Sequence, residues 1–176
     1  MKIRVLKADG TAEPYLHTKV LGTFHNALTL AEQWDLPAAE QMAEAVTFYI
    51  YRTGSSSNIS SDRIHLMVQS VLSSAGFPDA ADDLNQYRLN RRLLRRRLEV
   101  ISGRQEISGW SKSRVAKDLI REAQTDRLTA RAIAGAVEEK VLRMGLTRVH
   151  TSLLRELVRQ DTQAILQAEK QLAAVL

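Results

Sequence analysis

A change in hydrophobic periodicity near residue 17 constrains the fold of this chain more than any other feature of its sequence. Before it, residues 2–16 alternate apolar and polar side chains on either side of Asp9-Gly10, which is the pattern of a β-hairpin with a tight turn. Pro14 cannot donate a ladder hydrogen bond, so its strand should lie at a sheet edge or end there. After residue 17, apolar residues recur at the spacing of amphipathic helices. The sequence therefore predicts a mostly α-helical fold with a small N-terminal β-hairpin.

Helix start and stop signals divide the rest of the chain. Ser60 or Ser61 is a good N-cap, and GSSSN at 54–58 is expected to be a loop. ISGRQEISG at 101–109 has two Gly and no helical period, which predicts a domain boundary there. We expect one domain over 1–100 and a second, purely helical domain over 101–176. The expected helices are 17–36, 37–52, 60–76, 78–100, 111–122, 126–143 and 151–174.

Composition and missing motifs exclude several classes of function. The chain has no Cys, which rules out disulfides, thiolate zinc sites and cysteine nucleophiles. Its four His show no metal-ligand spacing, and there is no Gly-x-x-x-x-Gly-Lys-Ser/Thr phosphate loop, so we do not expect an enzyme. Charges interrupt the longest apolar runs, and the first residues do not resemble a signal peptide. We therefore expect a cytoplasmic protein without a membrane partner.

The basic residues are concentrated in one stretch. Six Arg and no acidic residue lie between Arg88 and Arg97, whereas residues 1–87 carry six basic and ten acidic residues. Outward-facing arginines at this density repel one another unless anions or acidic neighbours compensate them. Acidic residues of the same chain, nucleotide phosphates, nucleic acid and an acidic subunit all remain open as partners. The helical spacing predicts an inward stripe of Leu84, Tyr87, Leu94 and Leu98 and an outward one of Arg88, Arg92, Arg95 and Arg96.

Two other groups of residues have the chemistry to meet phosphate. A strand lysine, Lys7, and a lysine at the start of the next helix, Lys19, can surround a polyphosphate together with backbone NH groups. The alternative is a solvated hairpin with ordinary surface lysines. At Ser60-Ser61-Asp62, hydroxyls at a helix start can accept a phosphate or can simply cap the helix.

Taken together, these residues resemble the ATP-cone, the small regulatory domain of ribonucleotide reductases and of the ribonucleotide reductase transcriptional regulator. The family pattern is a Val-x-Lys-x-Asp-Gly-x-x-Glu hairpin ending in an aromatic residue, then a Lys-Val/Ile helix start. A hydroxyl-rich helix start and a closing Ala-x-x-Tyr-x-x-Tyr-Arg follow, which read here as Ile59 to Ile64 and Ala81-x-x-Leu84-x-x-Tyr87-Arg88. The hairpin and helix-start positions are filled by Val5, Lys7, Asp9, Gly10, Glu13, Tyr15, Lys19 and Val20.

The resemblance implies a site for ATP or dATP, with or without Mg²⁺. It places Val5, Leu6, Glu13 and Val20 beside the nucleoside. The residues that it places at the phosphates are Lys7, Lys19, Ser61 and Arg88 or Arg91. Ala8 and Leu84 depart from the family pattern, which usually has a basic residue and a tyrosine at these positions.

The second half of the chain contains a fainter copy of the same helices. Trp110 to Val115 parallels Tyr15 to Val20, and Val149 to Leu154 parallels Ile59 to Ile64. No Lys-x-Asp-Gly hairpin precedes this copy, so we expect it to lack the β-structure and to support folding or assembly.

The function expected from the resemblance is that of a non-catalytic regulator. Binding of an adenine nucleotide would control homo-oligomerisation or the binding of a regulated protein or nucleic acid. One alternative is a nucleic-acid-binding regulator that uses the basic helix Arg88–Arg97, and another is a nucleotide-free scaffold that serves oligomerisation.

Overall fold

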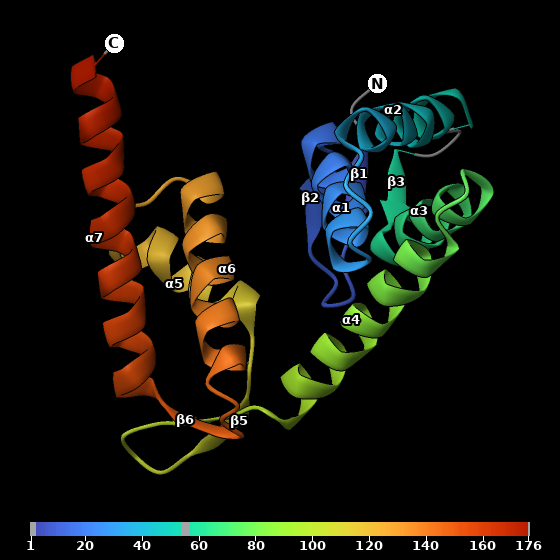
Figure 1. The fold of residues 1–176 in the computed structure, drawn as a ribbon. Coiled ribbons are helices and arrows are strands. Elements are labelled where there is room, and N and C mark those ends of the chain that lie inside the picture. Colours follow the sequence, from blue (N-terminus) through green and yellow to red (C-terminus); the bar gives the residue numbers. More distant parts are fainter. Residues whose placement is uncertain (1–2, 54–56, 176) are drawn as a thin grey trace. The chain divides into compact units, whose positions relative to one another are not determined.

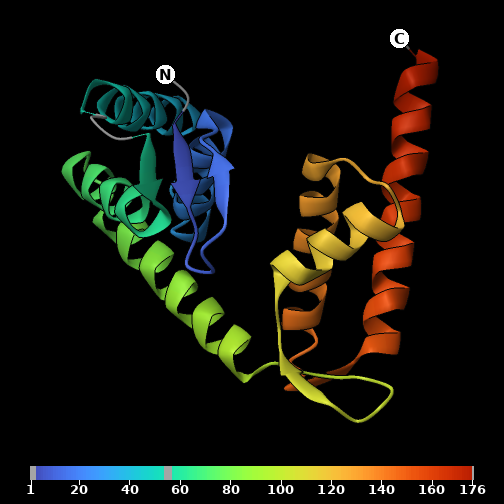
Figure 2. The same ribbon diagram turned by 180° about the vertical axis from the view of Figure 1, so that it is seen from behind.

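The computed structural model describes residues 3–53 and 57–175 and divides the chain into two compact units. The first unit ends at Leu89 and the second begins at Asn90. Helices dominate both units, and each holds one small three-stranded sheet (Figure 1; Figure 2 gives the reverse view). The prediction of a mostly α-helical fold with an N-terminal β-hairpin is confirmed.

The first unit is a small sheet packed with helices. Its sheet has the order β2-β1-β3, with β1 antiparallel to β2 and parallel to β3. The parallel pair is connected through two helices, as parallel pairing requires. The elements are β1 (Arg4–Leu6), β2 (Ala12–Pro14), α1 (His17–Leu30), α2 (Leu36–Thr53), β3 (Asn58–Ser60), α3 (Ser61–Ser74) and the first part of α4 (Pro78–Arg97).

The hairpin turn lies at Asp9-Gly10, as predicted, but it is not a two-residue turn. The amide of Gly10 donates to the carbonyl of Lys7 at 3.0 Å, and the amide of Lys7 donates to the carbonyl of Thr11 at 2.8 Å. Gly10 has a φ of +77°, whereas Asp9 is not in the left-handed region. A turn followed by a left-handed glycine therefore closes the hairpin, a common alternative to a type I′ turn.

Strand β3 was not predicted. Residues 54–58 were expected to be a loop; 54–56 lie outside the described residues, but Asn58 already belongs to β3. The hydrogen-bonded register puts Val5 opposite both Glu13 of β2 and Ile59 of β3. The side chains of Val5 and Glu13 share the buried face of the sheet. A three-residue strand is too short to show an alternating pattern, which is why the sequence did not reveal it.

The core of the first unit lies between this sheet face and the helices. Apolar side chains from α1, α2 and α3 meet there at helical spacing, as the sequence predicted. The largest side chains that are fully buried are Phe24, Leu28, Val46, Val68 and Leu72.

The second unit contains a sheet that the sequence analysis missed. The prediction of a domain without strands over 101–176 is wrong, because 101–109 forms most of a hairpin instead of a linker. The sheet order is β5-β4-β6, with β4 antiparallel to β5 and parallel to β6. The elements are β4 (Glu99–Ile101), β5 (Ile107–Gly109), α5 (Lys112–Glu122), α6 (Arg127–Arg143), β6 (Arg148–His150) and α7 (Thr151–Val175).

The second hairpin was missed for a physical reason. Its strands have three residues each, and its turn lacks an Asp-Gly pair. The left-handed position of the turn is taken by Gln105, with a φ of +60°, and not by a glycine. The two Gly of this segment, Gly103 and Gly109, do not have positive φ.

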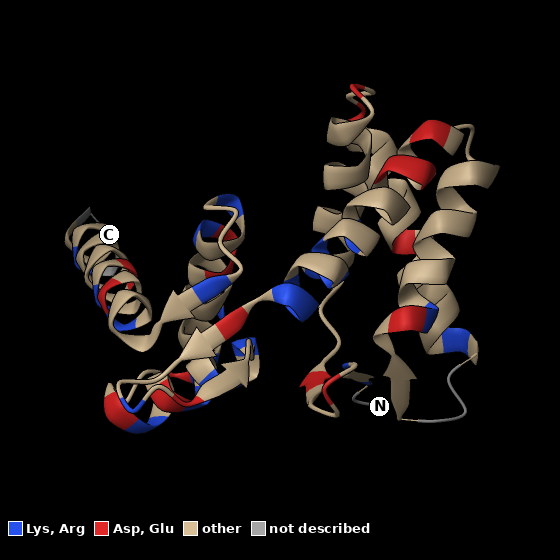
Figure 3. Ribbon diagram, turned by 90° about the horizontal axis from the view of Figure 1, so that it is seen from below, with Lys and Arg blue, Asp and Glu red and all other residues tan. Residues whose placement is uncertain are grey.

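The expected helices are present, with ends within a few residues of the predicted ones. Helix α4 ends at Arg97, and Glu99 and Val100, which were expected to continue it, belong to β4. Of its predicted inward stripe, Leu84 and Leu98 are buried, but Tyr87 and Leu94 are exposed. Figure 3 shows the basic residues that mark the second part of this helix. Within residues 3–53 and 57–175, no helix is both long and apolar enough to cross a membrane.

Candidate functional site

The first unit has a cavity of about 260 Å³ beside its β-hairpin. We call it the hairpin cavity. Strands β1 and β2, the first turns of α1 and α3, and α4 contribute to its wall. It is lined by Val5, Lys7, Glu13, Pro14, Tyr15, Leu16, Lys19, Val20, Thr23, Ser61, Ile64, His65, Val68 and Arg88.

Most of the predicted site residues meet at this cavity. Two do not. Leu6 follows Val5 in β1, so its side chain lies on the opposite, exposed face of the sheet. Arg91 belongs to the second unit and contacts carboxylates there. The predicted residues that line the hairpin cavity are Val5, Lys7, Glu13, Lys19, Val20, Ser61 and Arg88.

Two lysines converge on one buried carboxylate in the cavity. Glu13 is only 5% exposed, and its Oε2 lies 3.0 Å from Nζ of Lys19 and 3.5 Å from Nζ of Lys7. A carboxylate this deeply buried requires cationic partners to offset its lost hydration. The side chains of Lys7 and Lys19 line the cavity and are 35% and 55% exposed, so both stay accessible to solvent. Glu13 was expected beside a nucleoside, and its contacts here are with the lysines.

The first turn of α3 contributes polar groups to the same cavity. Ser60 caps this helix by accepting a hydrogen bond from the amide of Arg63 at 3.1 Å, which confirms the capping role. Ser61, the next residue, lines the cavity. Arg88 of α4, half-buried, also lines it and forms an ion pair with Asp62. The cavity thus has three cationic side chains against the single carboxylate of Glu13.

The remainder of the wall includes residues that the sequence analysis did not select. Thr23 and His65 follow Lys19 and Ser61 by four residues, and positions separated by four lie on the same helix face. That spacing was the signal available in the sequence.

Tyr15 of the cavity wall is buried, and its hydroxyl lies 2.8 Å from Oγ1 of Thr47. Burial raises the pKa of this hydroxyl. The apolar part of the wall consists of Val5, Val20, Ile64 and Val68.

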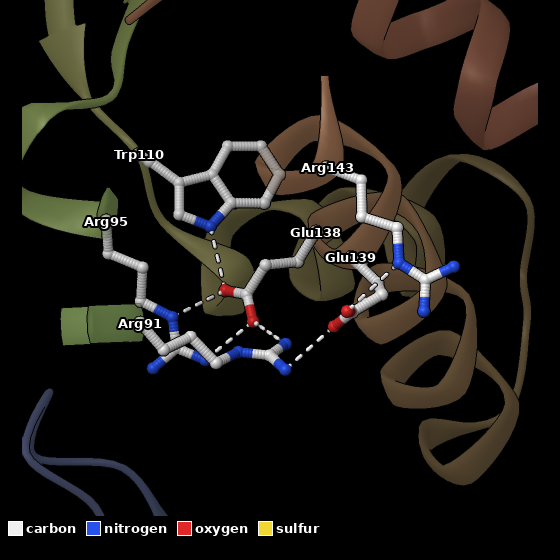
Figure 4. Close-up of polar contacts among 6 residues, drawn as sticks. All are labelled: Arg91, Arg95, Trp110, Glu138, Glu139 and Arg143. Atoms are coloured by element: carbon white, nitrogen blue, oxygen red, sulfur yellow. Dashed lines mark hydrogen bonds and ion pairs between the residues drawn. The ribbon is translucent and has the colours of Figure 1, made fainter. Parts of the chain in front are cut away.

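Arginines at the end of α4 hold a second buried carboxylate, Glu138 of α6, which is fully buried (Figure 4). Arg95 donates to both of its oxygens, at 2.6 and 3.0 Å, and Arg91 donates at 2.9 Å. The indole of Trp110 donates at 2.9 Å, and Arg91 also pairs with Glu139. Part of the basic stretch is therefore compensated by acidic residues of the same chain, and Arg95 reaches Glu138 although its side chain is 42% exposed.

The carboxyl of Glu138 has an unusual pKa. Burial raises it, but hydrogen bonds from Arg95, Trp110 and Arg91 outweigh burial and lower the pKa to about 2 from an ordinary value of 4.5. The folded state thus binds this proton more weakly than the unfolded chain does. The stabilisation from Glu138 is complete above about pH 4.5 and is lost as the pH falls towards 2.

This pKa predicts an acid-sensitive second unit. Between about pH 4.5 and pH 2, the wild type should lose about 3 kcal/mol more unfolding free energy than a Glu138→Gln variant. Urea unfolding at a series of pH values would measure the difference, with Trp110 as the only tryptophan after Trp34→Phe. Parallel pH profiles for the two proteins would contradict the prediction.

No metal centre emerges from the acidic residues and histidines. Across residues 3–53 and 57–175, no three His, Asp or Glu side chains are grouped so that they could hold an ion.

No protein-family model matches the chain, and no curated protein matches it significantly. The case for a function therefore depends on the geometry of the chain itself.

Proposed function

We propose that the first unit binds an adenine nucleotide, ATP or dATP, in the hairpin cavity. The observation that carries the proposal is the convergence of Lys7 of the β1–β2 hairpin, Lys19 of α1 and Arg88 of α4 on one cavity with an apolar wall. Cationic donors at the mouth suit phosphates, because hydrogen bonds between charged partners are stronger than neutral ones. Ser61 adds a hydroxyl group. The amide groups in the first turn of α3, which begins at Ser61, favour an anion.

The size of the cavity decides how a nucleotide would sit. Its volume of about 260 Å³ lies just below the roughly 300–1,000 Å³ that is usual for small-molecule pockets. It therefore suits the base and sugar, held against Val5, Val20, Ile64 and Val68, with the phosphates outside at the exposed ends of Lys7 and Lys19. Mg²⁺ would be held by the phosphates and water.

Binding would change the contacts of the hairpin. Phosphates that attract Lys7 and Lys19 compete with Glu13 for the same ammonium groups. Glu13 belongs to β2 and Lys19 to α1, so such competition acts on the junction between these elements. A regulator needs only about 1 to 3 kcal/mol of coupling between nucleotide binding and assembly. We therefore propose that the nucleotide controls homo-oligomerisation or the binding of a regulated partner, as the ATP-cone resemblance implies.

Calorimetric titration of the full chain with ATP, dATP and ADP tests the proposal, together with size-exclusion chromatography in each nucleotide. We expect saturable binding of at least one of them and a change in elution volume on binding. The absence of binding by all three would overturn the proposed function. Binding without any change in assembly would limit the regulation to a partner molecule.

The competing function, nucleic-acid binding through Arg88–Arg97, is less well supported. Arg88, Arg91 and Arg95 each pair with a carboxylate of the same chain, which reduces the charge available to a phosphate backbone. Binding to DNA or RNA that weakens steeply with salt would favour this alternative, because neutralised phosphates release counterions.

A further inference from the structure

The second unit has its own cavity, larger than the first. We call it the second-unit cavity. It measures about 720 Å³, which is within the roughly 300–1,000 Å³ typical of small-molecule sites. Its wall comes from the β4–β5 hairpin and from helices α5 and α7. These are the counterparts, in chain order, of the hairpin, α1 and α3 that surround the hairpin cavity.

The strand register makes this correspondence specific. In the first unit, Val5 on the central strand pairs with Glu13 on one side and with the parallel strand on the other. In the second unit, Val100 on the central strand pairs with Ser108 in the same way. Val5, Glu13, Val100 and Ser108 all line their respective cavities. Ser108 therefore occupies the position of the buried Glu13.

The helix positions correspond as well. Lys19 is the third residue of α1, and Arg114 is the third residue of α5. Ser61 is the first residue of α3, and Thr151 is the first residue of α7. All four line the cavities of their own units. The second unit thus keeps a cation and a hydroxyl in the corresponding places.

What the second-unit cavity lacks is a carboxylate at the position of Glu13. Instead of pairing with a carboxylate, Arg114 donates a hydrogen bond from Nη1 to the Ser108 hydroxyl at 3.3 Å. Arg155 lines the same cavity, one helical turn beyond Thr151. Throughout the described parts of the chain, neither Arg114 nor Arg155 forms an ion pair with a carboxylate. A serine in place of a glutamate also leaves more space, in keeping with the larger volume.

Most of the acidic residues in the wall of the second-unit cavity pair with an arginine that does not line it. Asp118 and Glu122 each accept a hydrogen bond from Arg121 at 2.9 Å. A third arginine of the wall, Arg159, is held by Glu156. The remaining acidic lining residue, Glu106, is exposed near the hairpin turn.

We propose that the second-unit cavity binds a phosphorylated small molecule with a ring system, of the size of a mononucleotide. Its phosphate takes the position that the Glu13 carboxylate has in the first unit, with donors from Arg114 and Arg155 and amide groups at the start of α7. The ring lies against the apolar side of the cavity, formed by Trp110, Val115 and Leu154. The sequence-based expectation of assembly alone depended on a missing hairpin, and this hairpin is present.

Tryptophan fluorescence gives this site its own reporter. Trp110 lines the cavity and Trp34 lies in the first unit, so a Trp34→Phe variant leaves only the Trp110 signal. AMP, ATP and inorganic phosphate are titrated into this variant, and calorimetry of the same samples detects binding that fluorescence does not. We expect saturable binding of AMP or ATP below millimolar concentration, weaker binding of phosphate, and at least about a tenfold loss on Arg114→Ala.

Two substitutions at Ser108 test the mechanism. Ser108→Glu restores an internal carboxylate, which should pair with Arg114 and abolish ligand binding. Ser108→Gln fills the same space without the charge that would pair with Arg114, so it should weaken binding, but less than Ser108→Glu does. Equal affinity in Ser108→Glu and wild type, or no binding of any probe by either method, would overturn the proposal. Lys19→Ala alters only the hairpin cavity. The number of ATP molecules that calorimetry finds per chain in this variant therefore shows which of the two cavities fails to bind.

Discussion

A Glu138→Ala substitution should destabilise the second unit by about 3 to 5 kcal/mol. Glu138 is fully buried and accepts hydrogen bonds from Arg91, Arg95 and Trp110. Its removal leaves two guanidinium groups and an indole NH without their acceptor and opens a void in the interior. The loss of one partner of a buried ionic group costs more than the net stabilisation by the group, because the partners stay partly desolvated.

Urea unfolding followed by Trp110 fluorescence in the Trp34→Phe background measures this effect. Glu156→Ala is the matched control, because the pKa of Glu156 is also lowered to about 2, mainly by hydrogen bonds from Arg159 and Gln160. Glu156 lies at the surface, where ion pairs contribute little, so its variant should unfold at nearly the wild-type urea concentration. Similar losses in both variants would show that burial of Glu138 is not what makes it important.

The second large effect is expected at the hairpin cavity. A Lys7→Ala, Lys19→Ala double variant should bind ATP about 100-fold more weakly or worse, since each hydrogen bond to a charged group contributes about 1.5 to 3 kcal/mol. The same variant leaves the Glu13 carboxylate buried without its two ammonium partners, so the first unit should also lose stability. Calorimetry measures the affinity, and hydrogen exchange of α1 and α3 measures the stability.

The two consequences can be separated by one further change. Addition of Glu13→Gln to the double variant removes the buried negative charge that has lost its ammonium partners. The stability of the first unit should therefore recover, while ATP binding stays lost. Lys117→Ala, an exposed lysine of α5 outside both cavities, is the control for a general loss of positive charge. If ATP binding recovers with Glu13→Gln, the lysines do not contact phosphate.

The sequence predicted the helices well because each shows several turns of periodic apolar residues, as in α1 with Val20, Phe24 and Leu28. It failed at the short strands. A three-residue segment such as Glu99–Ile101 acquires its identity from its neighbours in the sheet, and the parallel neighbour, Arg148–His150, is far along the chain. Pairing over such a distance leaves no local pattern in the sequence.

The same limit explains the outcome at the candidate site. Lys7 and Lys19 lie close together in sequence, so a hairpin followed by a helix start was enough to suggest that they could share one site, but their contacts with Glu13 were not predicted. The arginines of α4 recur every three or four residues, and their spacing does not say which carboxylate each one reaches. The resemblance placed Arg88 or Arg91 at phosphate, whereas the acceptors of Arg91 are on α6.

Helix α4 has a practical consequence for dissecting the molecule. The division between the units falls inside this helix, between Arg88, which pairs with Asp62, and Arg91, which pairs with Glu138. These arginines are less than one helical turn apart, so a cut between them frays the backbone that positions both. Fragments made for separate study should overlap, each keeping all of Pro78–Arg97.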